Sequence, residues 1–479
     1  MTARADGIDP ADLATCLRVL RELDALDVEH PDAVAVRHAV AGLFRSVKLR
    51  RRAERRAAVL AADAAVTAAT ATGAAGRIDD ETAGLALRPG TNGATAGTLV
   101  QARACYVCKR RYVEVDAFHH QLCPACAARN HARRDARTDL RGRRALLTGG
   151  RAKIGMYIAL KLLRDGAQTT ITTRFPRDAA RRFAAMPDSG DWLERLRIVG
   201  IDLRDPSQVM ALADDVAAQG PLDILVNNAA QTVRRSAAGY ALLARAEAAP
   251  LPAGPLPLIR TFVAAGGANG LPAAAGVPHW TPTPAALSAL ALRAGSASPA
   301  LIAAQRAIDA GGLVPDLDPV NSWSRHVHEV DPVELLEVQL CNQTAPFILV
   351  GRLRPALAAS SARRAYVVNV SAIEGQFQRG YKGPGHPHTN MAKAALNMLT
   401  RTSADELRAR DGILMTSVDT GWITDERPHP TRMRLAGEGF HAPLDLVDGA
   451  ARVYDPIVRG EAGEDLYGCF LKDYEPAPW

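Results

Sequence analysis

Four cysteines in two closely spaced pairs are the side chains of this sequence best suited to hold a metal ion. Cys105 and Cys108 form the first Cys-x-x-Cys pair, and Cys123 and Cys126 form the second. Two such pairs can place four thiolates at the corners of a tetrahedron, the coordination that structural Zn²⁺ sites use. Two disulfides are the competing interpretation, but the other cysteines are scattered and the N-terminus has no secretory pattern. We therefore predict a zinc ribbon over residues 101–135, with a structural and not a catalytic metal.

Basic segments lie on both sides of this predicted ribbon. Residues 48–56 read KLRRRAERR, and residues 129–144 read RNHARRDARTDLRGRR. Nucleic-acid binding is one interpretation of such charge, but no pattern of aromatic side chains for base stacking accompanies it, and a solvated helix face is the simpler explanation. We expect the ribbon to stabilise the fold or to dock a protein partner, and we do not expect it to bind nucleic acid.

A glycine-containing turn suggests a second chemistry, the binding of a phosphate group. The apolar run at residues 145–147 leads into TGGRAKIG at residues 148–155, and Ile158 and Leu162 continue at helical spacing. Glycines let the backbone approach a pyrophosphate, and the start of the following helix offers free N–H groups and a favourable dipole. The pattern is typical of the first half of a dinucleotide-binding unit.

Strands and helices alternate along the rest of the chain and predict the sheet that would position these residues. A helix-like segment at residues 389–410 separates two of the later strand candidates. Regular alternation of this kind favours a parallel, doubly wound α/β sheet of Rossmann type. The strand candidates lie within residues 168–173, 197–202, 222–228, 366–372 and 413–424.

In their order and spacing, these motifs resemble the short-chain dehydrogenase/reductase family. The resemblance covers residues 138–231 and 321–479. It implies an NAD(P)-dependent oxidoreductase that acts on a carbonyl, an alcohol or an imine. Between the two stretches lies an insertion at about residues 232–320, rich in Ala, Pro, Gly and Leu, which we expect to cover the substrate pocket.

Length and composition set the organisation of the whole chain. The 479 residues exceed one ordinary domain, and a hydrophobic content of 48% is sufficient for a core. The net charge of +7 favours anionic ligands. No apolar run is long enough to cross a bilayer, so we expect a cytoplasmic homo-oligomer that acts on a small molecule away from membranes. The expected divisions are a helical segment (1–65), an Ala/Thr/Gly linker (66–100), the zinc ribbon (101–135) and a Rossmann-type domain (138–479).

By this resemblance, the glycine turn would hold the cofactor pyrophosphate. Gly149 and Gly155 stand at two of the family's glycine positions, and Lys153 replaces the third. We expect Lys153 and the neighbouring Arg151 to face the phosphates.

The choice of cofactor depends on the end of the next strand. Thr173 stands where NAD-preferring relatives have an acidic residue, and Arg174 follows it. A guanidinium without a neighbouring carboxylate suits a 2′-phosphate, which favours NADP(H) over NAD(H). Further cofactor contacts implied by the resemblance are Ile154, Asp202 at the adenine, Leu203, Asn227, Lys393 at the nicotinamide ribose, and Ile423 and Thr424 at the carboxamide.

The resemblance also implies a catalytic set of Asn, Ser, Tyr and Lys. Asn342, Ser371 and Lys393 stand at three of the four positions. Thr389 stands where the family has its tyrosine, four residues before Lys393. A threonine hydroxyl has a far higher pKa than a phenol and is a poor acid at neutral pH.

Three interpretations of this substitution remain open. Tyr381, in the glycine-rich segment RGYKGPG, can supply the phenol from the preceding loop. His386 or His388 can act as the acid, since an unperturbed imidazole has a pKa of about 6.5. In the third interpretation the chain binds NADP(H) without turnover, as a scaffold or sensor that recruits a partner through the ribbon and the basic N-terminal region. We predict an oxidoreductase with Tyr381 as its proton donor and keep the inactive scaffold as the alternative.

Overall fold

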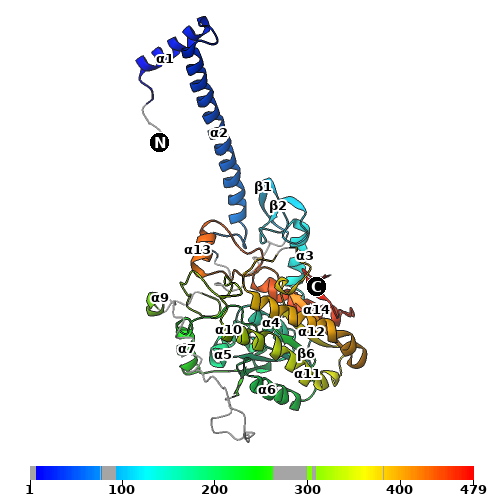
Figure 1. Ribbon diagram of the computed structural model, residues 1–479. Coiled ribbons are helices and arrows are strands. Elements are labelled where there is room, and N and C mark those ends of the chain that lie inside the picture. The colour runs from blue at the N-terminus through cyan, green and yellow to red at the C-terminus, as the bar shows by residue number, and fades with distance from the viewer. Residues whose placement is uncertain (1–6, 76, 78–92, 263–298, 305–308, 381) are drawn as a thin grey trace. The chain divides into compact units, whose positions relative to one another are not determined.

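The computed structural model describes residues 7–75, 77, 93–262, 299–304, 309–380 and 382–479 (Figure 1). The chain forms two compact units, Met1–Ala65 and Val66–Trp479. The first unit contains α1 (Pro10–Glu22), the 3₁₀ turn η1 (Leu23–Ala25) and most of α2 (Pro31–Ala68). The Asp9 carboxylate caps α1 by accepting a hydrogen bond from the Ala11 amide at 2.7 Å. Among the described residues of this unit only Ala33 is buried, so local helix propensity and capping, rather than a core, support these helices.

Within the described ranges, the second unit contains a nine-stranded sheet of order β11-β10-β9-β8-β6-β3-β4-β5-β7. Neighbouring strands run parallel, except that β11 is antiparallel to β10. From β3 the chain adds β4 and β5 on one side and then returns to add β6 on the other, and such a reversal leaves a crevice at the carboxyl ends of the strands. The predicted Rossmann-type α/β fold is confirmed. The strands are β3 (Arg144–Leu147), β4 (Gln168–Thr173), β5 (Leu196–Gly200), β6 (Ile224–Asn227), β7 (Leu258–Thr261), β8 (Ala365–Ser371), β9 (Ile413–Asp419), β10 (Phe470–Lys472) and β11 (Glu475–Ala477).

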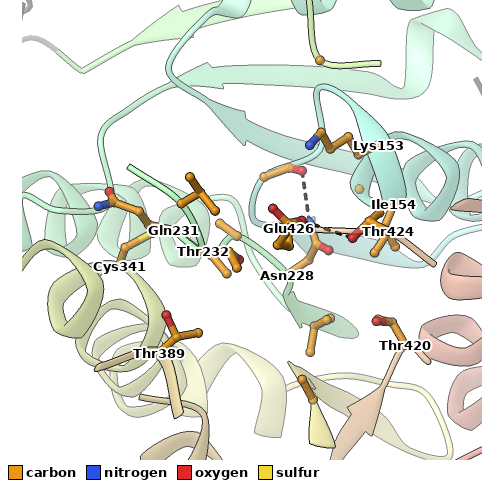
Figure 2. A pocket seen from close by; sticks show the side chains of 18 of the residues that line it. Lys153, Ile154, Asn228, Gln231, Thr232, Cys341, Thr389, Thr420, Thr424 and Glu426 are labelled. Carbon is orange, nitrogen blue, oxygen red and sulfur yellow. Dashed lines mark hydrogen bonds between the residues drawn. The ribbon is translucent and has the colours of Figure 1, made fainter. Parts of the chain in front are cut away.

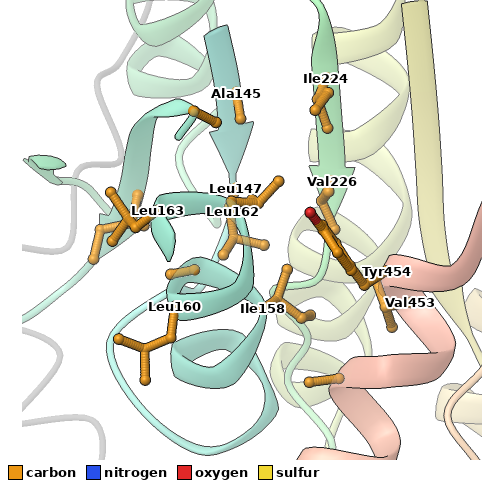
Figure 3. Close-up of a cluster of buried hydrophobic side chains, with 14 of the residues drawn as sticks. Ala145, Leu147, Ile158, Leu160, Leu162, Leu163, Ile224, Val226, Val453 and Tyr454 are labelled. Atoms are coloured by element: carbon orange, nitrogen blue, oxygen red, sulfur yellow. The ribbon is translucent and has the colours of Figure 1, made fainter. Parts of the chain in front are cut away.

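Helices cover both faces of the sheet, and alternate strand residues point to opposite layers. Leu147 of β3 shares one core with Ile158 and Tyr454 (Figure 3). Its neighbour Leu146 belongs to the core on the other face, with Leu212. No helix in the described part of the chain is both long and apolar enough to span a membrane. The α-helices in the described part of this unit are α3 (Pro124–Arg134), α4 (Lys153–Arg164), α5 (Pro176–Ala184), α6 (Pro206–Ala218), α7 (Ala241–Ala248), α9 (Pro299–Ala303), α10 (Pro332–Gln339), α11 (Ala345–Ala358), α12 (Pro387–Asp411), α13 (His429–Gly437) and α14 (Leu446–Glu461).

A small module built from β1 (Thr95–Ala104), β2 (Arg111–Asp116) and α3 belongs to the same unit as the sheet. Its two strands pair antiparallel, and the four cysteines lie in the β1–β2 turn and at the start of α3. Packing joins it to α14, because α3 and α14 are in contact. We call the segment from Thr95 to Arg134 the cysteine module.

The segment expected to be a linker, residues 66–100, differs from that expectation where the structure describes it. The hydroxyl of Thr72 donates a hydrogen bond to the backbone carbonyl of Phe118 at 2.8 Å. Arg77 is buried, and its guanidinium donates to the carbonyl of Leu444 at 2.7 Å. Short polar side chains can make such specific backbone contacts, which a composition rich in Ala, Thr and Gly does not reveal.

Candidate active site

A cavity of about 1950 Å³ opens at the carboxyl ends of the central strands. Its wall includes Gly149 after β3, Thr173 at the end of β4, Ser371 at the end of β8 and Asp419 at the end of β9. In parallel α/β sheets this edge is where ligands bind. The volume exceeds that of an ordinary drug-sized pocket of about 300–1000 Å³, so an extended ligand together with a second molecule fits the space.

The glycine turn is shaped as a dinucleotide would require. Gly149 has a φ of 72°, and a Cβ on Gly155 would lie 2.0 Å from the carbonyl oxygen of Gly149. Only glycine therefore fits at the start of α4. Lys153 has a φ of 55°, a left-handed conformation that costs a lysine on the order of 1 kcal/mol. The amide of Asn228 closes the turn by donating to the Gly149 carbonyl at 3.1 Å.

The two cations expected to face phosphate already contact carboxylates. Arg151 donates to the Asp178 carboxylate at 2.7 Å and to the carbonyl of Gly311 at 2.8 Å. The Lys153 ammonium lies 3.6 Å from the carboxylate of Asp309. Both cations line the cavity. A bound pyrophosphate would share them with these carboxylates, and their role as phosphate contacts stays a prediction.

Arg174 lies at the end of β4 among aromatic rings. Its guanidinium donates to the hydroxyl of Tyr240 at 3.1 Å and lies 5.2 Å from the centre of that ring. The rings of Phe175 and Tyr240 are stacked, with centres 5.9 Å apart. Although burial opposes the effect, the guanidinium groups of Arg174, Arg235 and Arg204 lower the pKa of Tyr240. This end of the cavity is therefore a cationic pocket with an aromatic wall.

Other residues expected at the cofactor divide into two groups. Asp202 lines the cavity and is paired with Arg204 at 2.6 Å. Asn227 differs from the expectation, because it is buried and donates to the Asn369 amide oxygen at 2.8 Å. Asn228, the residue after β6, lines the cavity, whereas Asn227 is not among the described residues of the cavity wall. The cavity wall also contains Ile154, Leu203, Ile423 and Thr424.

The described parts of the insertion, which we expected to cover the substrate pocket, contribute Thr232, Tyr240 and Gly311 to the cavity wall. Strand β7 pairs with β5, and α7 contacts α5. The Glu247 carboxylate accepts hydrogen bonds from the amides of Arg177 and Asp178, both at 2.9 Å, at the start of α5. The segment therefore supports the walls around Arg151 and Arg174. Its residues 263–298 and 305–308 lie outside the described residues.

Two of the residues implied in catalysis, Ser371 and Lys393, and the threonine at the family's tyrosine position, Thr389, lie on one wall of the cavity. The Ser371 hydroxyl donates to the Asn397 amide oxygen at 2.6 Å. The Lys393 ammonium donates to the Val370 carbonyl at 2.8 Å, and burial lowers the pKa of Lys393 to about 8. Thr389 points into the cavity (Figure 2), and its buried hydroxyl has no hydrogen-bond partner among the described residues. This wall offers a fixed hydroxyl, a buried amine and one uncommitted hydroxyl.

Asn342 has a different position from these three. It lies in a π-helical turn, Leu340–Thr344, between α10 and α11. Its amide donates to the carbonyl of Gln231 at 3.0 Å and accepts from the amide of Gln231 at 2.7 Å. Cys341 and Gln231, which neighbour Asn342, line the cavity, but Asn342 is not among the described residues of the cavity wall. The π turn thus turns the asparagine toward the loop after β6 and braces it.

The alternative proton donors lie elsewhere. His386 stacks on Trp323 with ring centres 3.7 Å apart, and burial lowers the pKa of His386. His388 is buried, with Nε2 3.6 Å from the carboxylate of Glu334. Neither imidazole is part of the cavity wall as the described residues form it, so their geometry does not suit them as the acid. Tyr381 lies outside the described residues.

The four cysteines come together as a metal site requires. Their sulfur atoms lie within 4.8 Å of one another, and the Sγ atoms of Cys108 and Cys123 are 3.7 Å apart. A tetrahedral Zn²⁺ with Zn–S bonds of about 2.3 Å holds its sulfurs about 3.8 Å apart, whereas a disulfide needs about 2.05 Å. Although burial opposes it, the Arg110 amide and the neighbouring thiols lower the pKa of Cys108 to about 7. The donor set fits zinc.

Two cavity residues were not expected from the sequence. Tyr106, inside the first cysteine pair, lines the cavity, and its hydroxyl accepts a hydrogen bond from the Trp422 amide at 2.9 Å. Asp419 is buried beside Ser371, and burial followed by the charges of Asp473 and Glu374 raises the pKa of Asp419 to about 6. No local pattern in the sequence marks either residue, because each acquires its surroundings from distant segments.

Comparison with known proteins finds one matching family and several relatives of the chain. Residues 143–243 match the family described as short chain dehydrogenase. An uncharacterized protein of Acanthamoeba polyphaga mimivirus is 29% identical over 372 residues, 74% of this chain and 71% of the relative. A probable oxidoreductase of Streptomyces antibioticus is 40% identical over 94 residues, 19% of this chain. That match covers only 30% of the relative's own length.

Solved structures with similar folds include three oxidoreductases or cofactor complexes. The NADPH-bound carbonyl reductase from chicken fatty liver is 16% identical with a TM-score of 0.43, covering 72% of this chain and 100% of that one. The carbonyl reductase Sniffer of D. melanogaster is 18% identical with a TM-score of 0.43, covering 71% and 100%. The Pseudomonas aeruginosa RhlG/NADP active-site complex is 20% identical with a TM-score of 0.42, covering 69% and 94%.

Proposed function

We propose that this chain, which belongs to the short-chain dehydrogenase/reductase family, is an NADP(H)-dependent oxidoreductase acting on a carbonyl, an alcohol or an imine. The observation that supports the proposal best is that Ser371, Lys393 and Thr389 share a cavity with the glycine turn. A cofactor held at the turn would extend along the strand ends toward these three side chains. NADPH, when bound, supplies the hydride.

NADP(H) is proposed over NAD(H) because of the end of β4. Thr173 contributes no carboxylate there, and the Arg174 guanidinium is held in place by Tyr240. A 2′-phosphate would gain a charge-assisted hydrogen bond from a guanidinium whose orientation is already fixed. Arg235 lines the same part of the cavity and adds a second positive charge.

Each residue near the reacting end has a proposed task. Ser371, whose hydroxyl is oriented by Asn397, would hold the substrate oxygen. Lys393, which is buried, would bind the hydroxyl groups of the nicotinamide ribose. Tyr381 is the proposed proton donor, since a phenol is a far better acid than the hydroxyl of Thr389. Thr389 would then hydrogen-bond the substrate or the ribose.

A structural zinc ion is part of the proposal. Cys105, Cys108, Cys123 and Cys126 have the separation that tetrahedral zinc needs. The metal would hold the β1–β2 turn to the start of α3, and so stabilise a module too small to have a large core of its own.

A second candidate function follows from Thr389. If no other group replaces the missing phenol, the chain is an NADP(H)-binding scaffold or sensor that recruits a partner protein through the cysteine module and the basic residues of α2. Binding of NADPH is common to both functions, and turnover separates them.

The test is therefore a measurement of NADPH binding and of NADPH oxidation on the same preparation. We expect binding in the micromolar range or tighter, and oxidation in the presence of some member of a panel of aldehydes, ketones and imines. Ser371→Ala should bind NADPH and lose the oxidation. Binding without oxidation for every substrate would favour the scaffold, and absence of NADPH binding would contradict both functions.

A further inference from the structure

The cysteine module and the cavity share one hydrophobic core. Cys105, Cys123 and Cys126 are buried in a cluster that also contains Ile423, from the segment that follows β9. Ile154, from the glycine turn, packs against the same cluster. Two residues expected to touch the cofactor thus belong to, or pack against, the same hydrophobic cluster as three of the cysteines.

Buried ion pairs fix how the module sits on the sheet domain. Nε2 of His119 lies 3.1 Å from the Asp448 carboxylate, and Nη2 of Arg134 donates to the Asp445 carboxylate at 2.9 Å. All four side chains are buried. Because separating such a pair leaves a buried charge unpaired, the module has little freedom to shift against α14.

Tyr106 is the residue through which the module reaches the cavity. It lies at the tip of the turn between Cys105 and Cys108, where the amide of Cys105 donates to the Arg110 carbonyl at 2.9 Å. Its hydroxyl accepts a hydrogen bond from the Trp422 amide. Trp422 is the residue before Ile423 and Thr424, so this bond holds the backbone of the segment at which the nicotinamide is expected.

We propose that the cysteine module holds part of the cofactor site in place. Tyr106 is a positioning residue for the segment Thr420–Thr424, and the metal fixes the position of Tyr106. Cys105 and Cys108, which flank Tyr106 in the sequence, are two ligands of the proposed zinc site. The ion therefore fixes the backbone conformation of the turn that carries the Tyr106 phenol. Loss of the metal frees that turn, withdraws the hydroxyl from the Trp422 amide and loosens the nicotinamide end of the site. The identities of the cofactor and of the metal rest on the proposed function, whereas the hydrogen bond by which Tyr106 holds the segment does not.

The experiment compares two tyrosines of the module in the full-length, metal-loaded protein. Tyr106→Phe removes the hydroxyl that accepts from Trp422. Tyr112→Phe is the matched control, because its buried hydroxyl donates to the His120 carbonyl within the module. Hydrogen–deuterium exchange of peptides that cover residues 420–424 reports the segment without any ligand. Titration with NADPH reports the site, and a chelator applied to the unaltered protein reports the effect of the metal.

We expect Tyr106→Phe to keep its metal, to exchange faster over residues 420–424, and to bind NADPH about fivefold more weakly, as loss of one hydrogen bond implies. Chelation should cause the same two changes, and Tyr112→Phe should cause neither. The inference would be overturned if residues 420–424 exchanged equally fast in Tyr106→Phe and in the unaltered protein. It would also be overturned if Tyr106→Phe and Tyr112→Phe had equal effects. If the unaltered protein does not bind NADPH, the proposed function fails, and the exchange experiment still decides the role of Tyr106.

Discussion

Ser371 ends β8 directly beside Asp419, which ends β9, because the two residues are register partners in parallel strands. Both line the cavity, and both are buried. The hydroxyl and the carboxyl therefore share one edge of the sheet. Burial, followed by the charges of Asp473 and Glu374, raises the pKa of Asp419 from 3.8 to about 6.

This shift predicts how stability depends on pH. Between pH 3.8 and about 6 the folded chain holds a proton on Asp419 that the unfolded chain has released. The stabilisation of the folded chain by the protonated Asp419 carboxyl is therefore fully present below pH 3.8. This stabilisation is lost as the pH rises through 6. Asp419→Asn removes the ionisable group, so the variant should gain on the order of 2 kcal/mol relative to the unaltered protein between pH 4 and pH 8. Urea unfolding at both pH values measures this difference.

The control for this prediction is Asp405→Asn on the exposed face of α12. It should leave the pH dependence of unfolding unchanged. If Asp419→Asn and Asp405→Asn show the same dependence as the unaltered protein, the carboxyl of Asp419 ionises as it would in water, and the burial argument is wrong.

Zinc binding is tested by elemental analysis of the purified chain. One Zn²⁺ per chain is expected, and Cys105→Ser should lose it, because three thiolates hold the ion far more weakly than four. Loss of the ion should expose the module of residues 95–134 to proteolysis. Cys16→Ser is the control, since Cys16 is an exposed residue of α1 and should leave metal content unchanged. Protein prepared without chelators that contains no zinc would disprove the site.

The choice of cofactor depends on Arg174. NADPH should bind about tenfold more tightly than NADH, a difference of about 1.4 kcal/mol. Arg174→Ala should remove most of that preference by weakening NADPH alone, because NADH has no 2′-phosphate. Arg352→Ala, which alters an exposed ion pair with Asp214, should change neither affinity. Equal binding of the two cofactors to the unaltered protein would show that Arg174 does not face a phosphate.

The proton donor is tested by four substitutions, with turnover and NADPH affinity measured for each. Tyr381→Phe should lower turnover on the order of a hundredfold with nearly unchanged NADPH affinity, as expected for loss of a general acid. Thr389→Ala should lower turnover much less. Lys393→Ala should weaken NADPH binding whether or not the chain is an enzyme. A harmless Tyr381→Phe together with a disabling His388→Ala would instead identify an imidazole as the donor, although His388 contacts Glu334 outside the cavity.

The sequence predicted the elements whose patterns are local. Residues 168–173 form β4 with the expected bounds, because a run of β-branched residues favours a strand and this run lies in the buried part of the sheet. The glycines at 149 and 155 also form the expected turn between β3 and α4, with a φ of 72° at Gly149. Both features depend on residues that are neighbours in the chain.

What the sequence could not predict depends on contacts between distant residues. Arg151 was expected at a phosphate, yet its partner Gly311 comes from the far end of the insertion, 160 residues later. Asn227 and Asn228 are adjacent and chemically equal, and only the pleat of β6 decides which faces the cavity. The cysteine module was expected to stand apart from the chemistry, and no periodicity links Tyr106 to Trp422, 316 residues away.

The buried pair between Arg134 and Asp445 has a consequence for the synthesis of the chain, because its two members are 311 residues apart. At about 5–20 residues per second, a ribosome needs on the order of 15–60 s to complete α14 after it has made α3. During that interval the cysteines can bind zinc, but Arg134 and His119 have none of their α14 partners. A chain truncated before Asp445, which lacks the partners of both Arg134 and His119, is therefore expected to bind zinc and yet remain protease-sensitive over residues 110–134, because these buried pairs form only after the C-terminal part of the chain has been made.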